Sequence, residues 1–314
     1  MAGQSASELR SALRRVLPGL DAEPIVVHRS EGRADPRWHS ATAVIDDAFV
    51  AKFAWSRVAA VRIHREGEIL VALRSAAPHL RLPEVVATSS DPTLLVTRLV
   101  SGAPLRSSEI AALDNAGLDR AAAEIGGFLA ELHDPAVLAQ VRRVAPMAVP
   151  EPQADTEVLR QRFGNWVSDQ QRETVLCWCD WTDTVLGRPS PPHVLVHGDL
   201  HGYNQVWDMT VPALRAVVDF DISGPTDAEF DFRYLPSQSS RPDFCRAIVR
   251  HYQRKSGRVI DLERVMAWHM RTVLGDALWR SEAAVELPDG GTPSSWVEGL
   301  AQRMIDAGVN PQVP

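Results

Sequence analysis

Two short stretches decide how this sequence is interpreted: His-Gly-Asp-Leu-His-Gly-Tyr-Asn at residues 197–204, and Asp-Phe-Asp at residues 219–221. They place an amide five residues after a first carboxylate, and a second carboxylate twenty residues after the first. Phosphoryl transfer from a nucleotide needs a base for the proton of the attacking hydroxyl, and oxygen ligands that hold Mg²⁺ on the phosphates. Asp199 is therefore the candidate base, and Asn204 and Asp219 are the candidate metal ligands.

The surrounding pattern predicts how these groups are held together. A short apolar strand at residues 194–196 delivers the first carboxylate at its end, and two further strands are expected at 205–208 and 214–220. The hairpin formed by these two strands folds Asp219 back beside Asn204, so that both reach one ion. Mg²⁺ takes hard oxygen ligands and few protein groups, which an asparagine and an aspartate satisfy. The alternative, a surface loop that happens to be rich in Asp and His, is disfavoured by the complete spacing.

The first stretch keeps the spacing of the H-R-D-L-x-x-x-N loop of protein kinases, with Gly198 in place of arginine. It resembles the H-G-D-x-x-x-x-N loop of the aminoglycoside phosphotransferase family. Asp219 and Asp231 resemble the metal-binding and the downstream structural aspartate of that family, and residues 129–133, L-A-E-L-H, resemble the end of one of its helices. The resemblance covers about residues 20–305. It implies an α+β, protein-kinase-like fold of two lobes, with a small five-stranded antiparallel sheet lobe and a larger, mainly helical lobe.

The order of the expected elements agrees with this implication. Helices are expected at residues 5–17 and 57–76, and strands at residues 25–29, 39–45, 49–53, 84–88 and 93–99. Beyond Gly102 and Pro104 the pattern is mostly helical from residue 107, with a proline-rich loop at 145–154. We therefore predict an N-terminal nucleotide-binding lobe at residues 1–100 and a C-terminal catalytic and acceptor-binding lobe at residues 101–314.

Lys52 is the candidate for binding the phosphates. It stands in an apolar strand and is one of only two lysines in a chain that otherwise uses arginine. This resembles the strand lysine of kinases, which binds the α- and β-phosphates and pairs with a helix glutamate; the alternative is an ordinary exposed lysine. At about 100° per residue, the apolar residues of the helix at 57–76 cluster around Glu66, whereas Glu68 points to solvent. A carboxylate that faces a core needs a cation, so Glu66 is the predicted partner.

Two further segments are assigned to the nucleotide. The segment at 30–35 lies where kinases carry a glycine-rich loop; it has one glycine rather than three, and Ser30 and Gly32 are its candidates for phosphate binding through backbone amides. The segment at 95–102 resembles the hinge that contacts the purine base, with backbone groups of Arg98 and Val100 as the expected contacts. Because these contacts use the backbone, the choice between ATP and GTP stays open.

Composition excludes several classes of function. The chain has 314 residues, of which 45% are hydrophobic and 23% charged, enough for two lobes around a cleft. A net charge of −7 argues against a nucleic-acid partner. The sequence contains no apolar run long enough to span a membrane, and residues 1–15 lack the apolar core of a signal peptide. We therefore expect a cytoplasmic protein; its oligomeric state is left open.

The acceptor is expected to be a small molecule, because residues 219–231 leave little room for the activation loop of a protein kinase. Residues 236–241 lack the acidic cluster that a loose resemblance to gentamicin-type 2″-phosphotransferases implies for binding aminoglycoside amines. The remaining acidic candidates are Asp227, Glu229, Asp276, Glu282 and Glu286. The tryptophans at 268, 279 and 296 offer either an apolar wall, as a macrolide or sugar would prefer, or core anchors.

Together these features predict a Mg²⁺-dependent phosphotransferase that moves the γ-phosphoryl group of ATP or GTP to a hydroxyl of a small molecule. Asp199 is the base, Asn204 and Asp219 hold the metal, Lys52 binds phosphates and Glu66 positions Lys52. An antibiotic acceptor, aminoglycoside-like or macrolide-like, is the leading hypothesis. A metabolic kinase for a sugar, amino alcohol or nucleoside uses the same chemistry, and a catalytically silent nucleotide-binding module is the alternative from a different class.

Overall fold

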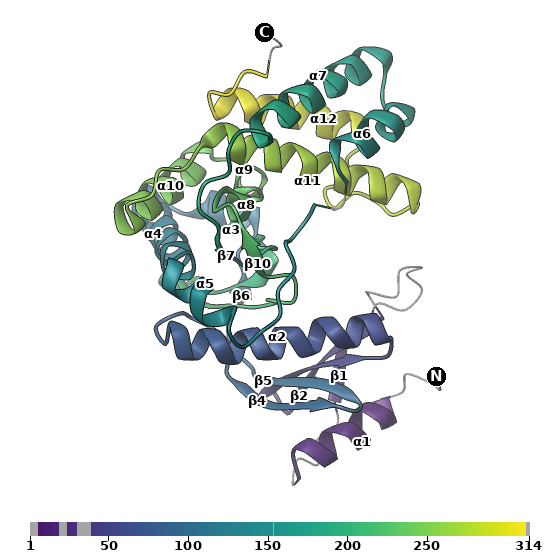
Figure 1. Cartoon of the computed structure of the whole chain (residues 1–314), viewed down its shortest axis with the longest axis vertical. Coiled ribbons are helices and arrows are strands. Elements are labelled where there is room, and N and C mark those ends of the chain that lie inside the picture. Colours follow the sequence, from purple (N-terminus) through teal and green to yellow (C-terminus); the bar gives the residue numbers. More distant parts are fainter. Residues whose placement is uncertain (1–5, 19–23, 30–38, 153, 312–314) are drawn as a thin grey trace.

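A computed structural model describes residues 6–18, 24–29, 39–152 and 154–311 of the chain. These residues form two lobes, a small lobe built on an antiparallel sheet and a larger, mainly helical lobe (Figure 1). The expected α+β architecture with a five-stranded sheet is therefore confirmed. None of the helices in the described ranges is both long and apolar enough to cross a membrane.

The sheet of the small lobe contains the five strands that the sequence predicts. They are β1 (Pro24–Arg29), β2 (Ser40–Ile45), β3 (Phe49–Ala54), β4 (Val85–Ser90) and β5 (Thr93–Arg98). Their order is β1-β2-β3-β5-β4, and every neighbouring pair is antiparallel. The turn between β2 and β3 uses Asp46 and Asp47 at φ values of 53° and 46°. Aspartate tolerates this left-handed region better than most residues, which keeps the hairpin tight.

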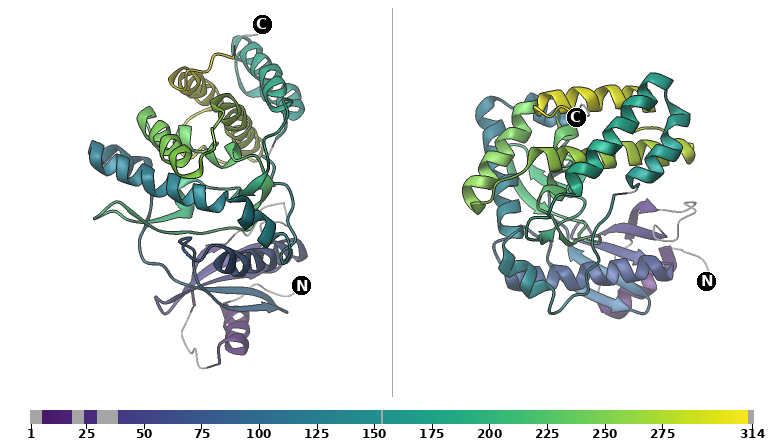
Figure 2. Two further views of the ribbon diagram at one scale, coloured as in Figure 1. Left: turned by 60° about the vertical axis from the view of Figure 1, so that its left-hand side comes forward. Right: turned by 45° about the horizontal axis from the view of Figure 1, so that its top comes forward.

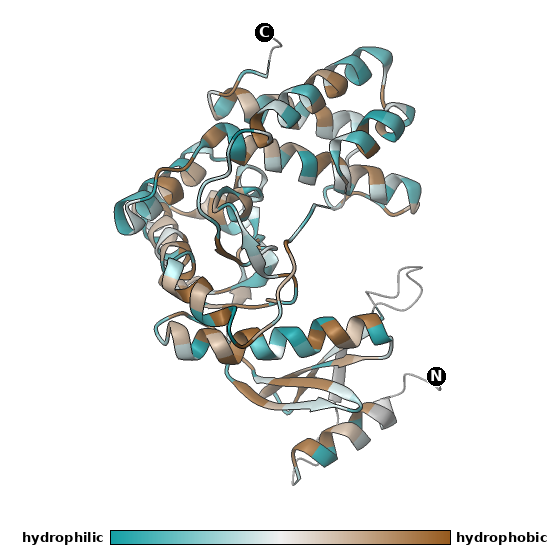
Figure 3. Ribbon diagram, viewed as in Figure 1, coloured by the Kyte–Doolittle hydropathy of each residue, from teal (hydrophilic) through white to brown (hydrophobic). Residues whose placement is uncertain are grey.

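Two helices cover opposite faces of this sheet, as Figures 1 and 2 show for α1 (Ala6–Val16) and α2 (Arg57–Ala76). Successive strand residues point to opposite faces. On β3, Ala51 and Phe53 pack in the cluster that contains the buried residues of α1, and Lys52 between them faces α2. Along α2, apolar and polar segments alternate (Figure 3), because the helix buries one side only.

The large lobe is mainly helical. Its helices are α3 (Ser107–Ala112), α4 (Asn115–Leu132), α5 (Pro135–Val141), α6 (Thr156–Arg162), η2 (Phe163–Trp166), α7 (Asp169–Leu186), α8 (Glu229–Phe232), α9 (Leu235–Gln238), α10 (Pro242–Ser256), α11 (Leu262–Glu282) and α12 (Pro293–Asp306). One buried cluster joins α2, α4 and α10 to the central strands, and a second joins α6, α7, α11 and α12. The helices α6, α7, α11 and α12 thus form a subdomain with its own core.

The predicted hairpin is present, but its second strand is shorter than expected. The strands of this lobe are β6 (Ala103–Pro104), β7 (Val194–Val196), β8 (Gln205–Asp208), β9 (Ala213–Val217) and β10 (Gly224–Thr226), with the short helix η3 (Gly202–Asn204) before β8. The prediction of a strand at 214–220 is wrong beyond Val217. The physical reason is that Asp219 has a φ of 71°, a left-handed conformation that a strand cannot contain.

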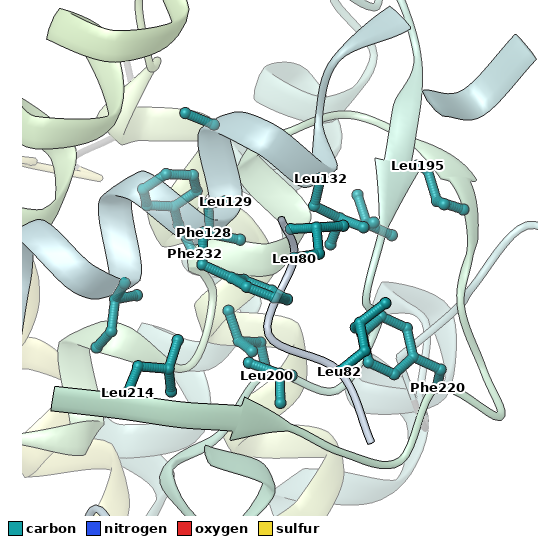
Figure 4. Close-up of a cluster of buried hydrophobic side chains, with 14 of the residues drawn as sticks. Leu80, Leu82, Phe128, Leu129, Leu132, Leu195, Leu200, Leu214, Phe220 and Phe232 are labelled. Carbon is teal, nitrogen blue, oxygen red and sulfur yellow. The ribbon is translucent and has the colours of Figure 1, made fainter. Parts of the chain in front are cut away.

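A buried apolar cluster fixes the segments that carry the candidate carboxylates (Figure 4). Leu200 follows Asp199 directly and Phe220 follows Asp219, and both apolar side chains are fully buried. They lie in the cluster with residues of α4 and of the strands, including Leu195. Each candidate carboxylate is therefore attached to a residue that the core holds in place.

The contact between α4 and α10 provides a stability prediction with an internal control. At Gly126 a Cβ atom would lie 2.7 Å from the Ile248 carbonyl oxygen on α10, whereas at Gly127 its nearest neighbour would be Lys255 Nζ at 3.6 Å. Gly127→Ala should raise the free energy of unfolding by about 0.5–1 kcal/mol through helix propensity. Gly126→Ala should instead lower it by about 1–3 kcal/mol, because α10 must move. Urea unfolding of both variants tests this, and equal shifts would contradict the close approach of the two helices.

Candidate active site

Lys52 lies at the centre of the candidate site and contacts carboxylates from both lobes. Its Nζ atom lies 2.7 Å from each carboxylate oxygen of Glu66 on α2, and 2.6 Å from Oδ1 of Asp219 in the helical lobe. The predicted pairing of Lys52 with Glu66 is therefore present. The expected helix register is also confirmed, because Glu66 is buried whereas Glu68 is partly exposed.

A second contact ties α2 to the same segment of the helical lobe. Arg62, one helical turn before Glu66, forms an ion pair with Asp221. Arg65 Nη2 donates a hydrogen bond of 2.6 Å to the main-chain carbonyl oxygen of Asp221. Residues four apart lie on the same face of a helix, so Arg62 and Glu66 both face the Asp219 loop. Helix α2 is thereby attached to this loop at two points.

The charges of this group influence one another strongly. Burial alone would lower the pKa of Lys52, but the carboxylates of Asp219 and Glu66 outweigh burial and raise it, so the ammonium group stays protonated. Burial would raise the pKa of Asp219, and the charge of Lys52 reverses this and lowers it. Burial, with the charge of Asp219, raises the pKa of Asp221 to about 7, and the Arg62 guanidinium opposes that rise.

The segment at residues 197–204, called the catalytic loop below because it carries the candidate base, contains a backbone position that requires glycine. Gly198 has a φ of 89°, and a Cβ atom there would lie 2.8 Å from the Ile222 carbonyl oxygen. Beside it, His197 Nδ1 accepts a hydrogen bond of 3.1 Å from the Asp199 N–H, and Nε2 lies 2.9 Å from the Val218 carbonyl oxygen. This pattern requires a neutral imidazole that donates through Nε2. Burial lowers the pKa of His197, which favours the neutral form.

Asp231 holds this loop in place through hydrogen bonds. This is the structural role that the family resemblance implies for the aspartate downstream of Asp219. Its carboxylate accepts hydrogen bonds from the main-chain N–H groups of His197 at 2.8 Å and Gly198 at 2.9 Å. His133 at the end of α4 lies 3.1 Å away through Nε2, and its Nδ1 lies 3.1 Å from the Tyr252 hydroxyl. Burial would raise the pKa of Asp231, but the hydrogen bond with His133, the nearby histidine charges and the Gly198 N–H together lower it. The brace therefore stays ionised.

Asp199 itself is held from several sides. The Asn204 amide nitrogen lies 2.9 Å from its main-chain oxygen and 3.3 Å from Oδ2, and His201 Nε2 lies 3.4 Å from Oδ2. Burial would raise the pKa of Asp199, but His201, Arg233 and Tyr234 together lower it well below its usual range. An ionised, oriented carboxylate of this kind can receive the proton of a hydroxyl group.

The residues predicted to hold Mg²⁺ fit that ion by their chemistry. The Asn204 amide nitrogen is engaged by Asp199, so its amide oxygen faces the other way. The Asp219 side chain is 40% exposed and is therefore accessible to a cation. Lys52 is shared between two carboxylates, which leaves negative charge for a further cation to neutralise. Mg²⁺ binds through one or two protein oxygens together with phosphates and water, so a small donor set is sufficient.

The expected nucleotide contacts outside Lys52 are only partly described. Ser30 and Gly32, the candidates of the phosphate loop, lie outside the described residues. The Arg98 N–H donates a hydrogen bond of 2.8 Å to the Glu84 carbonyl oxygen, so this N–H is not available to a purine base. Within the described ranges, Val100 makes no backbone hydrogen bond, and both its N–H and its carbonyl stay candidates for the base.

Most of the acidic side chains considered for the acceptor have partners within the protein. Ion pairs hold three of them: Asp227 with Arg264, Asp276 with Arg280, and Glu282 with Arg162. Glu229 is buried, and its Oε1 accepts a hydrogen bond of 3.2 Å from the Asp261 N–H. Glu286 remains as an exposed carboxylate. The acceptor side therefore offers fewer uncommitted carboxylates than the sequence suggests.

The three tryptophans considered as an acceptor wall are all partly exposed. Trp268 packs edge-on against Phe230 with ring centroids 5.1 Å apart, and the Arg271 guanidinium lies 5.2 Å from its ring. Trp296 is anchored through Nε1, which donates to the Asp289 carboxylate at 3.0 Å. Trp268 and Trp296 thus have anchoring roles, and they also retain exposed surface.

Sequence reasoning misses three side chains that complete this site. Arg62 could have been found, since it lies four residues before Glu66 on the same helix face. Arg233 and Tyr234 follow Asp231 directly, and Arg233 donates to the Gly198 carbonyl oxygen. The spacing of these two residues in the sequence does not indicate a role in the site, because their contacts depend on how the loop after α8 folds back onto the catalytic loop.

Comparison with known proteins agrees with the kinase-like fold. Residues 12–268 match the model of a family described as the phosphotransferase enzyme family. The GDP complex of wild-type aminoglycoside 2′-phosphotransferase-IIIa is 17% identical, with a TM-score of 0.71 over 97% of this chain and 99% of that chain. The streptomycin–ATP ternary complex of APH(2″)-IIa is 16% identical, with a TM-score of 0.61 over 90% and 93%.

Macrolide 2′-phosphotransferase MphH from Brachybacterium faecium is 19% identical, with a TM-score of 0.57 over 95% of this chain and 97% of that chain. At these identities the likeness to solved structures shows the fold alone. No curated protein sequence matches the chain. The family match covers most of the chain and includes every candidate residue in the described part of the site.

The two glutamates of α2 provide a matched test of the site. Glu66→Gln should reduce kcat/KM for nucleotide clearly, because Glu66 orients Lys52, whereas Glu68→Gln should be close to neutral. An exposed charge contributes less than about 1 kcal/mol, while a misplaced phosphate-binding group changes the geometry of the reacting atoms. Steady-state kinetics of both variants decide between the two carboxylates. If Glu68→Gln is the damaging change, the role given to the Lys52–Glu66 pair is wrong.

Proposed function

Because the chain belongs to the phosphotransferase enzyme family, we propose that it moves the γ-phosphoryl group of ATP or GTP to a hydroxyl group of a small molecule. The observation that supports this most is that Lys52 contacts Glu66 and Asp219, while Asn204 contacts the Asp199 carboxylate and accepts a hydrogen bond from the N–H of Val218, the residue before Asp219. A phosphate-binding cation, two metal ligands and a base are the parts that phosphoryl transfer needs. A catalytically silent module has no need for an ordered base beside these ligands.

On the nucleotide side, we assign phosphate binding to residues 1–100, with Lys52 as the main contact. Glu66 holds the ammonium group in place, and its two oxygens at equal distance leave Lys52 little freedom to rotate. Asn204 and Asp219 would hold Mg²⁺, which neutralises charge on the β- and γ-phosphate oxygens when bound. The backbone at Val100 is the proposed contact to the purine.

On the acceptor side, within residues 101–314, Asp199 would accept the proton of the attacking hydroxyl. Its lowered pKa keeps it ionised at neutral pH, so its contribution is to orient the hydroxyl and to receive the proton as the new bond to phosphorus forms. The hydrogen bonds from Asn204 fix its direction. Such positioning reduces the entropy that the reacting groups must lose.

We propose an antibiotic as the acceptor, with a metabolic hydroxyl compound as the alternative. Within the antibiotics, a macrolide-like molecule with few charges fits better than a polycationic aminoglycoside. The reason is that three of the acidic candidates already form ion pairs with arginines, and breaking such a pair to bind an amine costs the energy of that pair. The exposed surface of the tryptophans adds an apolar contribution.

The direct test measures release of ADP or GDP in the presence of Mg²⁺ across macrolides, aminoglycosides and sugars. We expect acceptor-dependent release by the wild-type protein. Asp199→Asn should lower kcat by about 10²–10⁴-fold, the usual effect of losing a general base, with little change in nucleotide affinity. Near-normal kcat in this variant would remove Asp199 from the role of base. A wild-type protein that binds nucleotide but releases no product with any acceptor would favour the silent module.

The metal assignment has its own test in Asp219→Ala. This variant should lose Mg²⁺-dependent turnover, and it should bind the Mg²⁺–nucleotide complex more weakly while metal-free nucleotide is less affected. The cause is that the ion loses its anchor on the protein and no longer holds the phosphates in line. Calorimetric titration with and without Mg²⁺ measures the difference. An equal Mg²⁺ dependence in wild type and variant would contradict the assignment.

A further inference from the structure

Asp219, the candidate metal ligand, has a backbone conformation that is unusual for a residue with a side chain. Its φ of 71° lies in the left-handed region. A residue other than glycine keeps this conformation only where the surrounding structure fixes it, and such positions are common at functional sites. The contacts on either side of Asp219 therefore decide where its carboxylate points.

The helical lobe holds the two residues next to Asp219. The Val218 N–H donates a hydrogen bond of 2.9 Å to the Asn204 carbonyl oxygen, and the Val218 carbonyl oxygen lies 2.9 Å from His197 Nε2. On the other side, the Phe220 side chain is fully buried in the apolar cluster of that lobe. The next residue along the chain, Asp221, is held from the small lobe instead.

Two arginines of α2 hold Asp221. Arg62 forms an ion pair with Oδ2 of Asp221, and the two side chains are only 18% and 14% exposed. Arg65 Nη2 donates a hydrogen bond of 2.6 Å to the Asp221 carbonyl oxygen. Because residues three and four apart share a helix face, the face of α2 that carries Glu66 also fixes the side chain and the backbone of Asp221. The segment at residues 218–221 is thus held at both ends.

The ion pair also gives the two carboxylates of this segment different roles. Arg62 neutralises Asp221, whereas Asp219 is 40% exposed and shares the Lys52 ammonium group with a second carboxylate. An unpaired carboxylate at Asp221, two residues from Asp219, would compete with it for a cation. With Arg62 in place, the accessible negative charge is that of Asp219.

We propose that Arg62 is a positioning residue for the metal site: by holding Asp221 from the opposite lobe, it keeps Asp219 in the left-handed conformation in which its carboxylate contacts Lys52 and is accessible to Mg²⁺. This inference rests on the proposed function, because it assigns Arg62 a role through Asp219. A ligand that is fixed beforehand loses less conformational freedom when the ion binds, so binding is tighter. The competing interpretation is that Arg62 binds a phosphate directly, for which an arginine side chain is well suited.

A double-mutant cycle separates these two roles. Arg62→Gln and Asp221→Asn each remove the ion pair. Both should weaken binding of the Mg²⁺–nucleotide complex by about fivefold or more, while metal-free nucleotide binds as in the wild type. The double variant should bind no more weakly than the weaker single variant, because both changes remove the same interaction.

Arg74→Gln is the matched control. Arg74 also lies on α2, but its Nη2 donates a hydrogen bond of 2.9 Å to the Leu82 carbonyl oxygen within the small lobe. Nucleotide binding with and without Mg²⁺ should therefore be unchanged in this variant. If Arg62→Gln fails to fold, Arg62→Lys, which keeps the positive charge and loses the planar guanidinium group, takes its place in the cycle.

The readouts are calorimetric titrations with ATP and GTP in the presence and absence of Mg²⁺, the Tm of every variant, and crystal structures of the wild type and Arg62→Gln without nucleotide. A loss confined to the Mg²⁺ complex, shared by both single variants and not enlarged in the double variant, supports the proposal. In the crystal structure of Arg62→Gln, we expect Asp219 to leave the left-handed region or residues 218–221 to be disordered.

Wild-type affinity for the Mg²⁺ complex in Arg62→Gln, or an additive loss in the double variant, overturns the proposal. A loss of metal-free nucleotide binding in Arg62→Gln, with unchanged affinity in Asp221→Asn, also overturns it and identifies Arg62 as a phosphate ligand. If the wild type binds nucleotide but releases no product with any acceptor, the proposed function fails, and the calorimetric cycle still decides the role of Arg62. If it binds no nucleotide, the conformation of Asp219 in the two crystal structures decides.

Discussion

One ammonium group, that of Lys52, contacts a carboxylate from each lobe at the centre of the site. Lys52 contacts Glu66 from its own lobe and Asp219 from the other at distances of 2.6–2.7 Å. A buried or partly buried carboxylate without a cation is costly, so each carboxylate depends on this contact. Because one ammonium group lies between two carboxylates, this group of side chains has a net negative charge and attracts a further cation. This property suits a metal–nucleotide complex, which brings both a divalent cation and phosphates that need Lys52.

The helical lobe presents the second half of the site on a backbone that is held by buried hydrogen bonds rather than by packing alone. Gly198 turns the chain where a side chain would collide with Ile222. Asp231 then fixes the two N–H groups at this turn, and a chain of hydrogen bonds continues through His133 to Tyr252 on α10. The brace connects the catalytic loop to α4 and α10, two helices that approach each other closely at Gly126, so the position of the loop depends on the packing of these helices.

The sequence predicts the orientation of those site residues whose position follows from the regular repeat of a single strand or helix. The two-residue period of β3 turns Lys52 toward α2, and the helical period of α2 places Glu66 inward. These two positions need no knowledge of the rest of the fold. The helical period places Arg62 on the same face as Glu66, but its partner Asp221, the contact of Arg233 with Gly198 and the end of β9 could not be predicted in this way, since they arise where segments distant in sequence meet.

The segment at residues 95–102, which is expected to contact the purine base, also has contacts that a local sequence pattern does not predict. Backbone contacts of Arg98 and Val100 look alike in the sequence, yet the N–H of Arg98 is engaged by the Glu84 carbonyl oxygen across the β4–β5 edge and that of Val100 is not.

The central claim is that Lys52 contacts both carboxylates until a metal–nucleotide complex binds. The most direct measurement is a crystal structure with Mg²⁺ and a non-hydrolysable nucleotide. The account predicts that Asp219 and Asn204 ligate the ion at about 2.1 Å while Lys52 keeps Glu66 and contacts the phosphates. An ion bound away from Asp219, or a Lys52 that leaves Glu66, would contradict it.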